Sequence, residues 1–192
     1  QTIQALCTTL IEQFRDINSK KPLFIRLSLA QKTPQLRLPF EHTMYDETVI
    51  VELEKSEDDI LAGMSQSGRA GLRKAQKAGV EVSEITDNRA EFFKKHCYPI
   101  LKETGSRDGF GIHPLGLYTH MLHVLGDTAR LYVATHNKKV QAWAITTEYN
   151  SQAMYYYGGS SANARDIYAA YSLHWEIIKD MKQRNNKTYD FM

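Results

Sequence analysis

Three β-rich runs follow one another closely between residues 129 and 157, and this order constrains the fold more than any other feature. Valine, threonine and aromatic side chains dominate the runs, and short polar turns separate them, which is typical of neighbouring strands. The runs span 129–135, 140–148 and 153–157. A long helix, 163–184, and a last strand, 187–192, come next. Since a helix can return the chain to the same sheet, this order predicts an antiparallel meander within a mixed sheet, and therefore the α+β class.

The first 125 residues alternate helices with short strands. Predicted helices cover 2–20, 56–79, 88–102 and 114–125, and predicted strands cover 23–29, 48–53 and 80–85. A glycine-rich segment, 105–111, breaks the helical spacing and is predicted to be a loop. Helix 2–20 with its basic turn and strand resembles helix 163–184 with its own turn and strand. Chance also explains such a similarity; if it is a repeat, the chain holds two copies of one fold, with a boundary near residues 83–88.

The helix predicted for 56–79 has two different faces. Ser56 begins it as a capping residue, and Gly79 ends it in the left-handed conformation. Apolar side chains recur along one face, whereas Arg69, Arg73 and Lys77 form a cationic ridge on another. Such a ridge is either a solvated surface or a contact for phosphate groups, and the helix alone does not decide between the two.

Composition limits the classes of function. The 192 residues carry a net charge of +2, which is too small to attract nucleic acid by overall electrostatics, so such a partner would need a local patch. Cys7 and Cys97 are far apart and have no metal-ligand spacing, which favours a reduced, cytoplasmic setting. No apolar run is long enough to cross a bilayer. Because the sequence starts at Gln1 and stops within a predicted strand, we expect both natural ends to be missing.

Three segments carry a family resemblance. Residues 61–80 read LAGMSQSGRAGLRKAQKAGV, residues 103–110 read ETGSRDGF, and residues 155–161 read YYYGGSS, with YSLHWEIIK and YDF following at 171–179 and 189–191. Together and in this order they resemble the Fem family of peptidoglycan-bridge aminoacyltransferases. The family's later glycine turn and Phe-Lys motif lie beyond this sequence. Only about twenty residues separate Phe110 from Leu131, so the chain is similar to the armless, FemX-like members.

The resemblance implies tandem GNAT-like domains with mixed sheets, the first of them incomplete. Residues 1–85 would be the C-terminal part of the first domain, and residues 86–192 the second. The implied substrates are an aminoacyl-tRNA and a UDP-linked or lipid-linked muropeptide precursor. A monomer that needs no cofactor and makes peripheral contact with the inner face of the membrane is expected.

Transfer of an aminoacyl group from an ester to an amine is downhill, so the protein needs mainly to position two substrates and stabilise an oxyanion. Neither a metal nor a tuned acid–base pair is required, and His113, His120 and His123 lack the carboxylate or cysteine spacing of a metal site. By resemblance, Arg107 lies near the diphosphate of the precursor, and Phe110 is a further candidate substrate-binding residue. Local pairing of Arg107 with Asp108 is the alternative.

The cations of the ridge become candidates for tRNA phosphates in the light of the resemblance. These candidates are Arg69, Arg73 and Lys77.

Three consecutive tyrosines precede two glycines at 155–159. On a regular strand Tyr155 and Tyr157 share one face and Tyr156 takes the other, so they either line a cleft or pack within the sheet. All three are candidate substrate-binding residues. Gly158 and Gly159 allow a close backbone approach.

The Q/R-x-x-G-x-G/A signature of coenzyme A sites is absent after this strand, which counts against that cofactor. His174 lies within an apolar helical stripe, where a core role is commoner than a catalytic one. Two alternatives stay open: a GNAT-like acyltransferase that uses coenzyme A, and a non-catalytic binding module.

Overall fold

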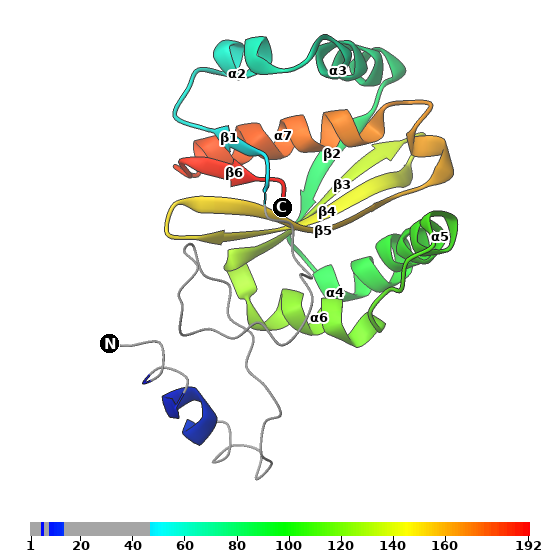
Figure 1. Cartoon of the computed structure of the whole chain (residues 1–192). Coiled ribbons are helices and arrows are strands. Elements are labelled where there is room, and N and C mark those ends of the chain that lie inside the picture. Colours follow the sequence, from blue (N-terminus) through cyan, green and yellow to red (C-terminus); the bar gives the residue numbers. More distant parts are fainter. Residues whose placement is uncertain (1–4, 6–7, 14–46) are drawn as a thin grey trace. The chain divides into compact units, whose positions relative to one another are not determined.

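The computed structural model describes residues 5, 8–13 and 47–192 (Figure 1). The chain divides into two compact units, 1–43 and 44–192. In the first unit, residues 8–13 are helical, in agreement with the helix predicted for 2–20. The strand predicted for 23–29 lies outside the described residues.

A six-stranded mixed sheet organises the second unit. Its strand order is β1-β6-β5-β4-β3-β2, and β5 and β6 are parallel while every other neighbouring pair is antiparallel. The strands are β1 (Ile50–Glu52), β2 (Glu81–Ile85), β3 (Ala129–His136), β4 (Lys139–Tyr149), β5 (Gln152–Ser160) and β6 (Thr188–Asp190). The predicted meander, mixed sheet and α+β class are therefore confirmed.

Helices cover both faces of the sheet. The α-helices are α2 (Glu57–Gly63), α3 (Gln66–Ala78), α4 (Arg89–Phe92), α5 (Tyr98–Asp108), α6 (Leu115–Val124) and α7 (Ala169–Gln183). In Figure 1, α7 lies against one face with α2 and α3 above it, and α4, α5 and α6 lie against the other. Two apolar clusters fill these layers: one joins Leu72, Leu173 and Ile177, and the other joins Phe93, Leu122 and Trp143.

Three helices differ from the prediction. The helix predicted for 56–79 is two helices, because Ser65 begins α3 by accepting a hydrogen bond from the Gly68 amide (3.1 Å). The helix predicted for 88–102 continues through a π-helical turn, Phe93–Cys97, to Asp108, so half of the predicted loop 105–111 is helical. The helix predicted for 163–184 starts at Ala169, after a residue with φ of 58°.

The predicted boundary at 85–86 does not separate two sheets in the described part of the chain. Strand β2 precedes it and pairs with β3, and β1 precedes it and pairs with β6. The described residues from 47 onward are one compact unit because these edge strands complete the sheet. The assignment of residues 1–85 to the C-terminal part of a first GNAT-like domain, and of residues 86–192 to a second, stays a prediction.

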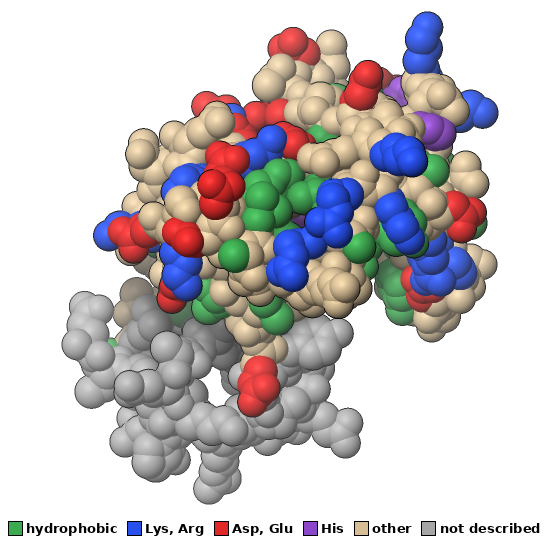
Figure 2. Space-filling model, turned by 90° about the horizontal axis from the view of Figure 1, so that it is seen from above, with side chains coloured by type: hydrophobic (Ala, Val, Ile, Leu, Met, Phe, Trp, Pro, Cys, Tyr) green, Lys and Arg blue, Asp and Glu red, His purple; other side chains and the backbone are tan. Residues whose placement is uncertain are grey.

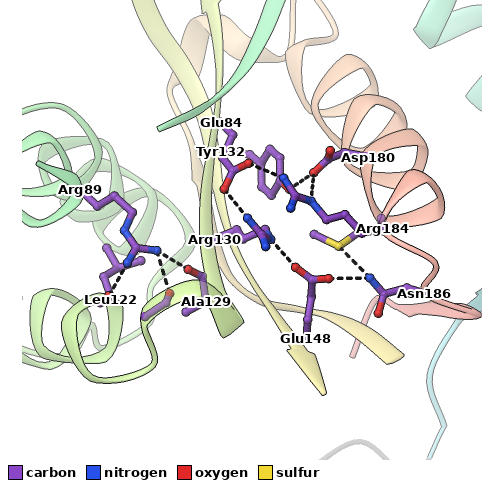
Figure 3. A network of polar contacts seen from close by, with 12 residues as sticks. Glu84, Arg89, Leu122, Ala129, Arg130, Tyr132, Glu148, Asp180, Arg184 and Asn186 are labelled. Carbon is purple, nitrogen blue, oxygen red and sulfur yellow. Dashed lines mark hydrogen bonds and ion pairs between the residues drawn. The ribbon is translucent and has the colours of Figure 1, made fainter. Parts of the chain in front are cut away.

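A charged network closes one end of the sheet (Figure 3). Arg130 on β3 lies between two carboxylates: it donates to Glu84 of β2 at 2.8 Å and to Glu148 of β4. Arg184, just after α7, donates to Glu84 at 2.9 Å and to Asp180 at 2.7 Å. The network therefore ties β2, β3, β4 and α7 together.

Candidate functional site

A polar cavity of about 250 Å³ lies where β5 runs into the turn before α7. Strands β4 and β5, the last turn of α5 and the first turns of α7 enclose it. Its polar lining residues include Thr104, Arg107, Asp108, Ser160, Arg165 and His174. The sheet thus brings together side chains from positions that are seventy residues apart in the sequence.

Tyr155, Tyr156 and Tyr157 do not alternate as on a regular strand. Ile145 pairs with Tyr157 and Thr146 pairs with Tyr155, so Tyr156 is the extra residue of a β-bulge. Tyr155 consequently packs in the apolar cluster beside α7, whereas Tyr157 packs in the opposite cluster. The ring centroids of Tyr157 and Tyr118 are 5.0 Å apart. The prediction that the outer two tyrosines share a face is wrong, because the bulge turns one of them over.

Of these tyrosines, Tyr155 lines the polar cavity. Its burial raises the pKa of its phenol, so it stays protonated at neutral pH. Tyr156 is 42% exposed and stacks edge-on against Tyr157. The structure therefore brings one of the three together with Arg107, and substrate binding by Tyr156 and Tyr157 stays a prediction.

The two glycines after the tyrosines make close contacts that a side chain would block. A Cβ at Gly158 would lie 2.0 Å from the Tyr155 hydroxyl, and one at Gly159 would lie 2.8 Å from Nε1 of Trp143. The wall of the polar cavity is thus built by direct contact of backbone with aromatic rings.

Arg107 lies at the C-terminal end of α5 and lines the polar cavity. Its guanidinium donates to both carboxylate oxygens of Asp108, at 2.9 and 3.0 Å, and to the Ser160 carbonyl at 3.1 Å. The hydrogen bond from Arg107 holds the pKa of Asp108 below its usual value. The local pair considered from the sequence is therefore formed, and it positions the guanidinium at the cavity.

Phe110 is half exposed and is not among the residues that line the polar cavity. It follows Gly109, whose φ of 74° ends α5. The structure does not bring Phe110 together with Arg107 at this cavity, and its role in substrate binding stays a prediction.

The three cations of the α3 ridge differ in their surroundings. Arg69 donates through Nη1 to the carbonyls of Ala62, at 3.1 Å, and of Met64, and so caps the end of α2. Arg73 and Lys77 are exposed and, among the described residues, have no partner. Figure 2, which looks down on the α2 and α3 side, shows Lys and Arg side chains around a patch of apolar ones.

An apolar cavity of about 480 Å³ lies between α3 and α7. Its walls include Met64, Leu72, Trp175, Ile178 and Phe191. His174 and Ala170 line both this cavity and the polar one, so the two are neighbours along α7.

His174 lines the polar cavity, although its apolar helical stripe favours a core role. Its Nδ1 lies 3.1 Å from the hydroxyl of Tyr189, and its ring packs edge-on against Tyr155 at 4.8 Å. Burial lowers the pKa of His174 to about 4, so the ring is neutral at pH 7. The sequence signal for this residue is a histidine in the second turn of a helix that follows a glycine-rich strand end.

The turn between β5 and α7 is filled by the protein's own groups. The Ala162 amide donates to the Glu103 carboxylate at 2.7 Å, and the Ser161 hydroxyl donates to the Gln141 side chain at 2.7 Å. The Glu103 carboxylate therefore occupies one amide of the 3-10 turn Ala162–Ala164, which precedes α7.

No group of three or more His, Cys, Asp or Glu among the described residues could hold a metal ion. Within the same residues, no helix is both long and apolar enough to span a bilayer.

The fold and site define a class of protein. Residues 64–192 match the model of the acetyltransferase (GNAT) domain family, and because this match covers most of the chain, the protein belongs to that family. No curated protein matches the sequence.

Solved structures similar to this one place the fold more closely. FemX has a TM-score of 0.68 and 17% identity, over 75% of this chain and 52% of that chain. L-PGS from Bacillus licheniformis has a TM-score of 0.56 and 12% identity, over 75% and 43%. A conserved protein of unknown function from Bacteroides thetaiotaomicron has a TM-score of 0.54 and 15% identity, over 75% and 49%.

The chain therefore spans about half the length of these structures. At such identities the likeness describes the fold, and the Fem-like GNAT fold predicted from the sequence is confirmed. Between Phe110 and Leu131 the structure has α6 and a short 3-10 turn, without a long helical arm inserted in those residues.

Proposed function

We propose that the protein transfers an aminoacyl group from tRNA to an amine of a peptidoglycan precursor, in the formation of an interpeptide bridge. One observation carries the proposal. The polar cavity joins a guanidinium, Arg107, with a neutral imidazole, His174, at the end of β5, while one amide of the neighbouring turn already donates to Glu103.

The chemistry of the cavity suits ester-to-amide transfer. The acceptor amine attacks the ester carbonyl carbon, and the carbonyl electron pair moves onto oxygen. As the carbonyl re-forms, the bond to the tRNA ribose oxygen breaks, and the proton lost by the amine ends on that oxygen. The ester supplies the driving force, so the protein has to orient the substrates and stabilise the oxyanion.

Coenzyme A is disfavoured as the donor by the β5–α7 turn. GNAT enzymes that use it grip its diphosphate with free amides at a helix N-terminus, where the local field favours negative charge. Here the Glu103 carboxylate already accepts the Ala162 amide, so this amide is not free to donate to the diphosphate of coenzyme A. The fold of FemX and of L-PGS, which is shared with this chain, supports an aminoacyl donor.

The acceptor would bring a diphosphate to the side of the cavity that carries Arg107 and Arg165. Both guanidinia lie near the carboxylate of Asp108, at 2.9 and 3.8 Å. A UDP-linked or lipid-linked muropeptide could displace Asp108 from one of them, because an arginine binds phosphate oxygens in the same two-pronged way. A lipid-linked acceptor would place the protein at the inner face of the membrane.

The tRNA backbone would lie along the exposed ridge of α3. Arg73 and Lys77 are the proposed phosphate contacts, since Arg69 is engaged at the end of α2. Reversing the charge of both exposed residues should weaken aminoacyl-tRNA binding and flatten its salt dependence. Unchanged affinity would show that tRNA does not bind along this face of α3.

The test is transfer of radiolabelled amino acids from charged bulk tRNA to a UDP-linked muropeptide by the full-length protein. We expect label in the muropeptide, and we expect Arg107→Lys to raise the KM for the acceptor about tenfold, because lysine cannot bind phosphate in two-pronged fashion. Lys95→Gln, at an exposed lysine of the neighbouring π-helical turn, is the control and should change neither constant.

Two outcomes would contradict the proposal. Membership of the acetyltransferase family favours coenzyme A as the second candidate donor. A rise in melting temperature with acetyl-coenzyme A, together with no transfer to UDP-linked or lipid-linked acceptors, would establish that donor. No response to either class of ligand would indicate a non-catalytic binding module.

A further inference from the structure

His174 lies where the polar and apolar cavities meet, and it lines both. Three aromatic rings hold it. Tyr155 packs edge-on at 4.8 Å, the ring centroid of Phe191 lies at 4.9 Å, and Tyr189 lies at 6.2 Å. These rings pack around the imidazole, which lines both cavities.

The two ring nitrogens have different environments. Nδ1 lies 3.1 Å from the Tyr189 hydroxyl. Nε2 makes no hydrogen bond within the described part of the chain. Among the described residues, the buried side-chain atoms that lack a hydrogen-bond partner are Nε1 of Trp143 and Oγ1 of Thr146. Nε2 of His174 is not one of them. Nε2 is therefore not completely buried, and the two cavities that His174 lines are the space that it meets.

The surroundings of Tyr189 decide which partner carries the proton. Tyr189 is fully buried, and Nδ1 is the partner of its hydroxyl among the described residues. If Nδ1 donated to the hydroxyl, the hydroxyl hydrogen would be left buried without an acceptor, which is the costly arrangement. If the hydroxyl donates to Nδ1, the hydroxyl hydrogen has an acceptor, and the single N–H of the neutral ring is then on Nε2, at the cavity.

We propose that His174 presents a neutral Nε2–H to the cavity as a hydrogen-bond donor for the carbonyl oxygen of the acyl donor, and that Tyr189 is the positioning residue that fixes this tautomer. The identity of the ligand rests on the proposed function; the tautomer does not. In this role His174 does not take the proton of the amine. It stabilises the charge that develops on oxygen during attack, as a preorganised donor.

The charge of the ring is compatible with this role. Burial lowers the pKa of His174 to about 4, so a neutral donor is present throughout the physiological range. The titratable groups that face it are the phenols of Tyr155 and Tyr189, and Arg107, Asp108 and Arg165 line the same polar cavity.

The first test is nitrogen NMR of protein labelled with ¹⁵N-histidine at pH 7. Signals of His174 are assigned by their loss in His174→Gln. We expect an unprotonated Nδ1 and a protonated Nε2 in the native protein, and a mixture of tautomers in Tyr189→Phe, which lacks the hydroxyl. A protonated Nδ1, or a ring protonated on both nitrogens, would overturn the proposal.

The second test separates a donor from a base. In the aminoacyl transfer assay, His174→Leu should lower kcat about 100-fold with little change in KM. His174→Gln keeps an N–H but cannot act as a base, and it should retain kcat within about tenfold of the native value. Equal losses in both variants, with folded protein, would overturn the donor role.

A ligand titration distinguishes failure of this proposal from failure of the proposed function. Puromycin is used as the probe, because its amide carbonyl stands in for the ester of an aminoacyl nucleoside. If no transfer is detected but the Nε2–H signal shifts on addition of puromycin, the proposed reaction is wrong and the donor assignment stands. An unmoved signal in a protein without transfer activity overturns both.

Discussion

At the scale of single residues, the site depends on glycines, which have no side chain, as much as on the side chains that line the cavity. Gly159 has no Cβ, so its backbone lies directly against the indole of Trp143, which is 1% exposed and sits at the centre of its apolar cluster. A ring that is 1% exposed has little room to move aside, because protein cores are as dense as organic crystals. This part of the cavity wall therefore requires a residue without a side chain at position 159.

This contact predicts the effect of Gly159→Ala. The added methyl group would lie 2.8 Å from Nε1 of Trp143, and we expect a loss of about 1–3 kcal/mol in the free energy of unfolding, typical of overpacking. Gly116→Ala is the control, since a Cβ there meets no atom within 4 Å. Urea unfolding of both variants checks the prediction, which fails if the two are equally stable.

The low pKa of His174 predicts how stability depends on pH. A ring with a pKa of about 4 in the folded state and about 6.5 when unfolded binds more protons unfolded between these values. Stability then falls as pH decreases through that window. Between pH 7 and pH 5, protonation of this group is expected to lower the free energy of unfolding by about 2 kcal/mol.

Urea unfolding of native protein and His174→Gln at both pH values measures this contribution. The glutamine variant cannot titrate, so its stability should change by about 2 kcal/mol less between the two pH values. Identical pH dependence in the two proteins would contradict the assignment of a buried, neutral ring.

At the scale of elements, the ends of helices decide which cations are free to bind a partner. Arg69, Arg73 and Lys77 look equivalent in sequence because they recur every four residues on one helix. The break between α2 and α3 makes them different, since Arg69 reaches back to the carbonyls of Ala62 and Met64. A side chain that caps a neighbouring helix stabilises the fold first, whatever else it contacts.

Arg69→Gln and Arg73→Gln form a matched pair that tests this difference. Arg69→Gln should lower the free energy of unfolding by about 1–2 kcal/mol, because carbonyls at the end of α2 lose their donor. Arg73→Gln should change it by less than about 0.5 kcal/mol, as is usual for an exposed position. Thermal unfolding is the measurement. Equal stabilities would show that Arg69 is not needed as a cap.

At the scale of the whole molecule, the order of elements could be predicted from the sequence, whereas the site could be predicted only in part. Strand and helix spacing is a local property, and β3, β4, β5 and α7 fall close to their expected positions. The bulge at Tyr156 and the contact of His174 with Tyr189 are pairings between distant segments, which no local pattern records.

The limits of the compact unit are also set by distant pairing. Strands β1 and β2 close the two edges of the sheet, and the charged network around Arg130 fastens β2 to β3, β4 and α7. The groups of this network come from residues 84 to 186. The contribution of the network to the free energy of unfolding therefore belongs to the unit as a whole.

Arg130→Met tests that contribution. Arg130 is 16% exposed and lies between Glu84 and Glu148, so its loss leaves these carboxylates near each other, with Arg184 as the remaining cation of Glu84. We expect about 2–3 kcal/mol less stability, below the loss typical of a fully buried ion pair, because this pair is partly exposed. The double variant Arg130→Met, Glu148→Gln should recover part of this loss, because one of the repelling charges is removed.

Lys94→Gln is the control for ion pairing at the surface. Its partner Glu91 is 69% exposed, and their ammonium–carboxylate distance is 3.3 Å, so breaking this pair should cost less than about 0.5 kcal/mol. Chemical unfolding followed by tryptophan fluorescence reports all three variants, since Trp143 and Trp175 lie in opposite apolar clusters. If Arg130→Met were no less stable than Lys94→Gln, the edges of the sheet would have to be held by backbone pairing and apolar packing alone.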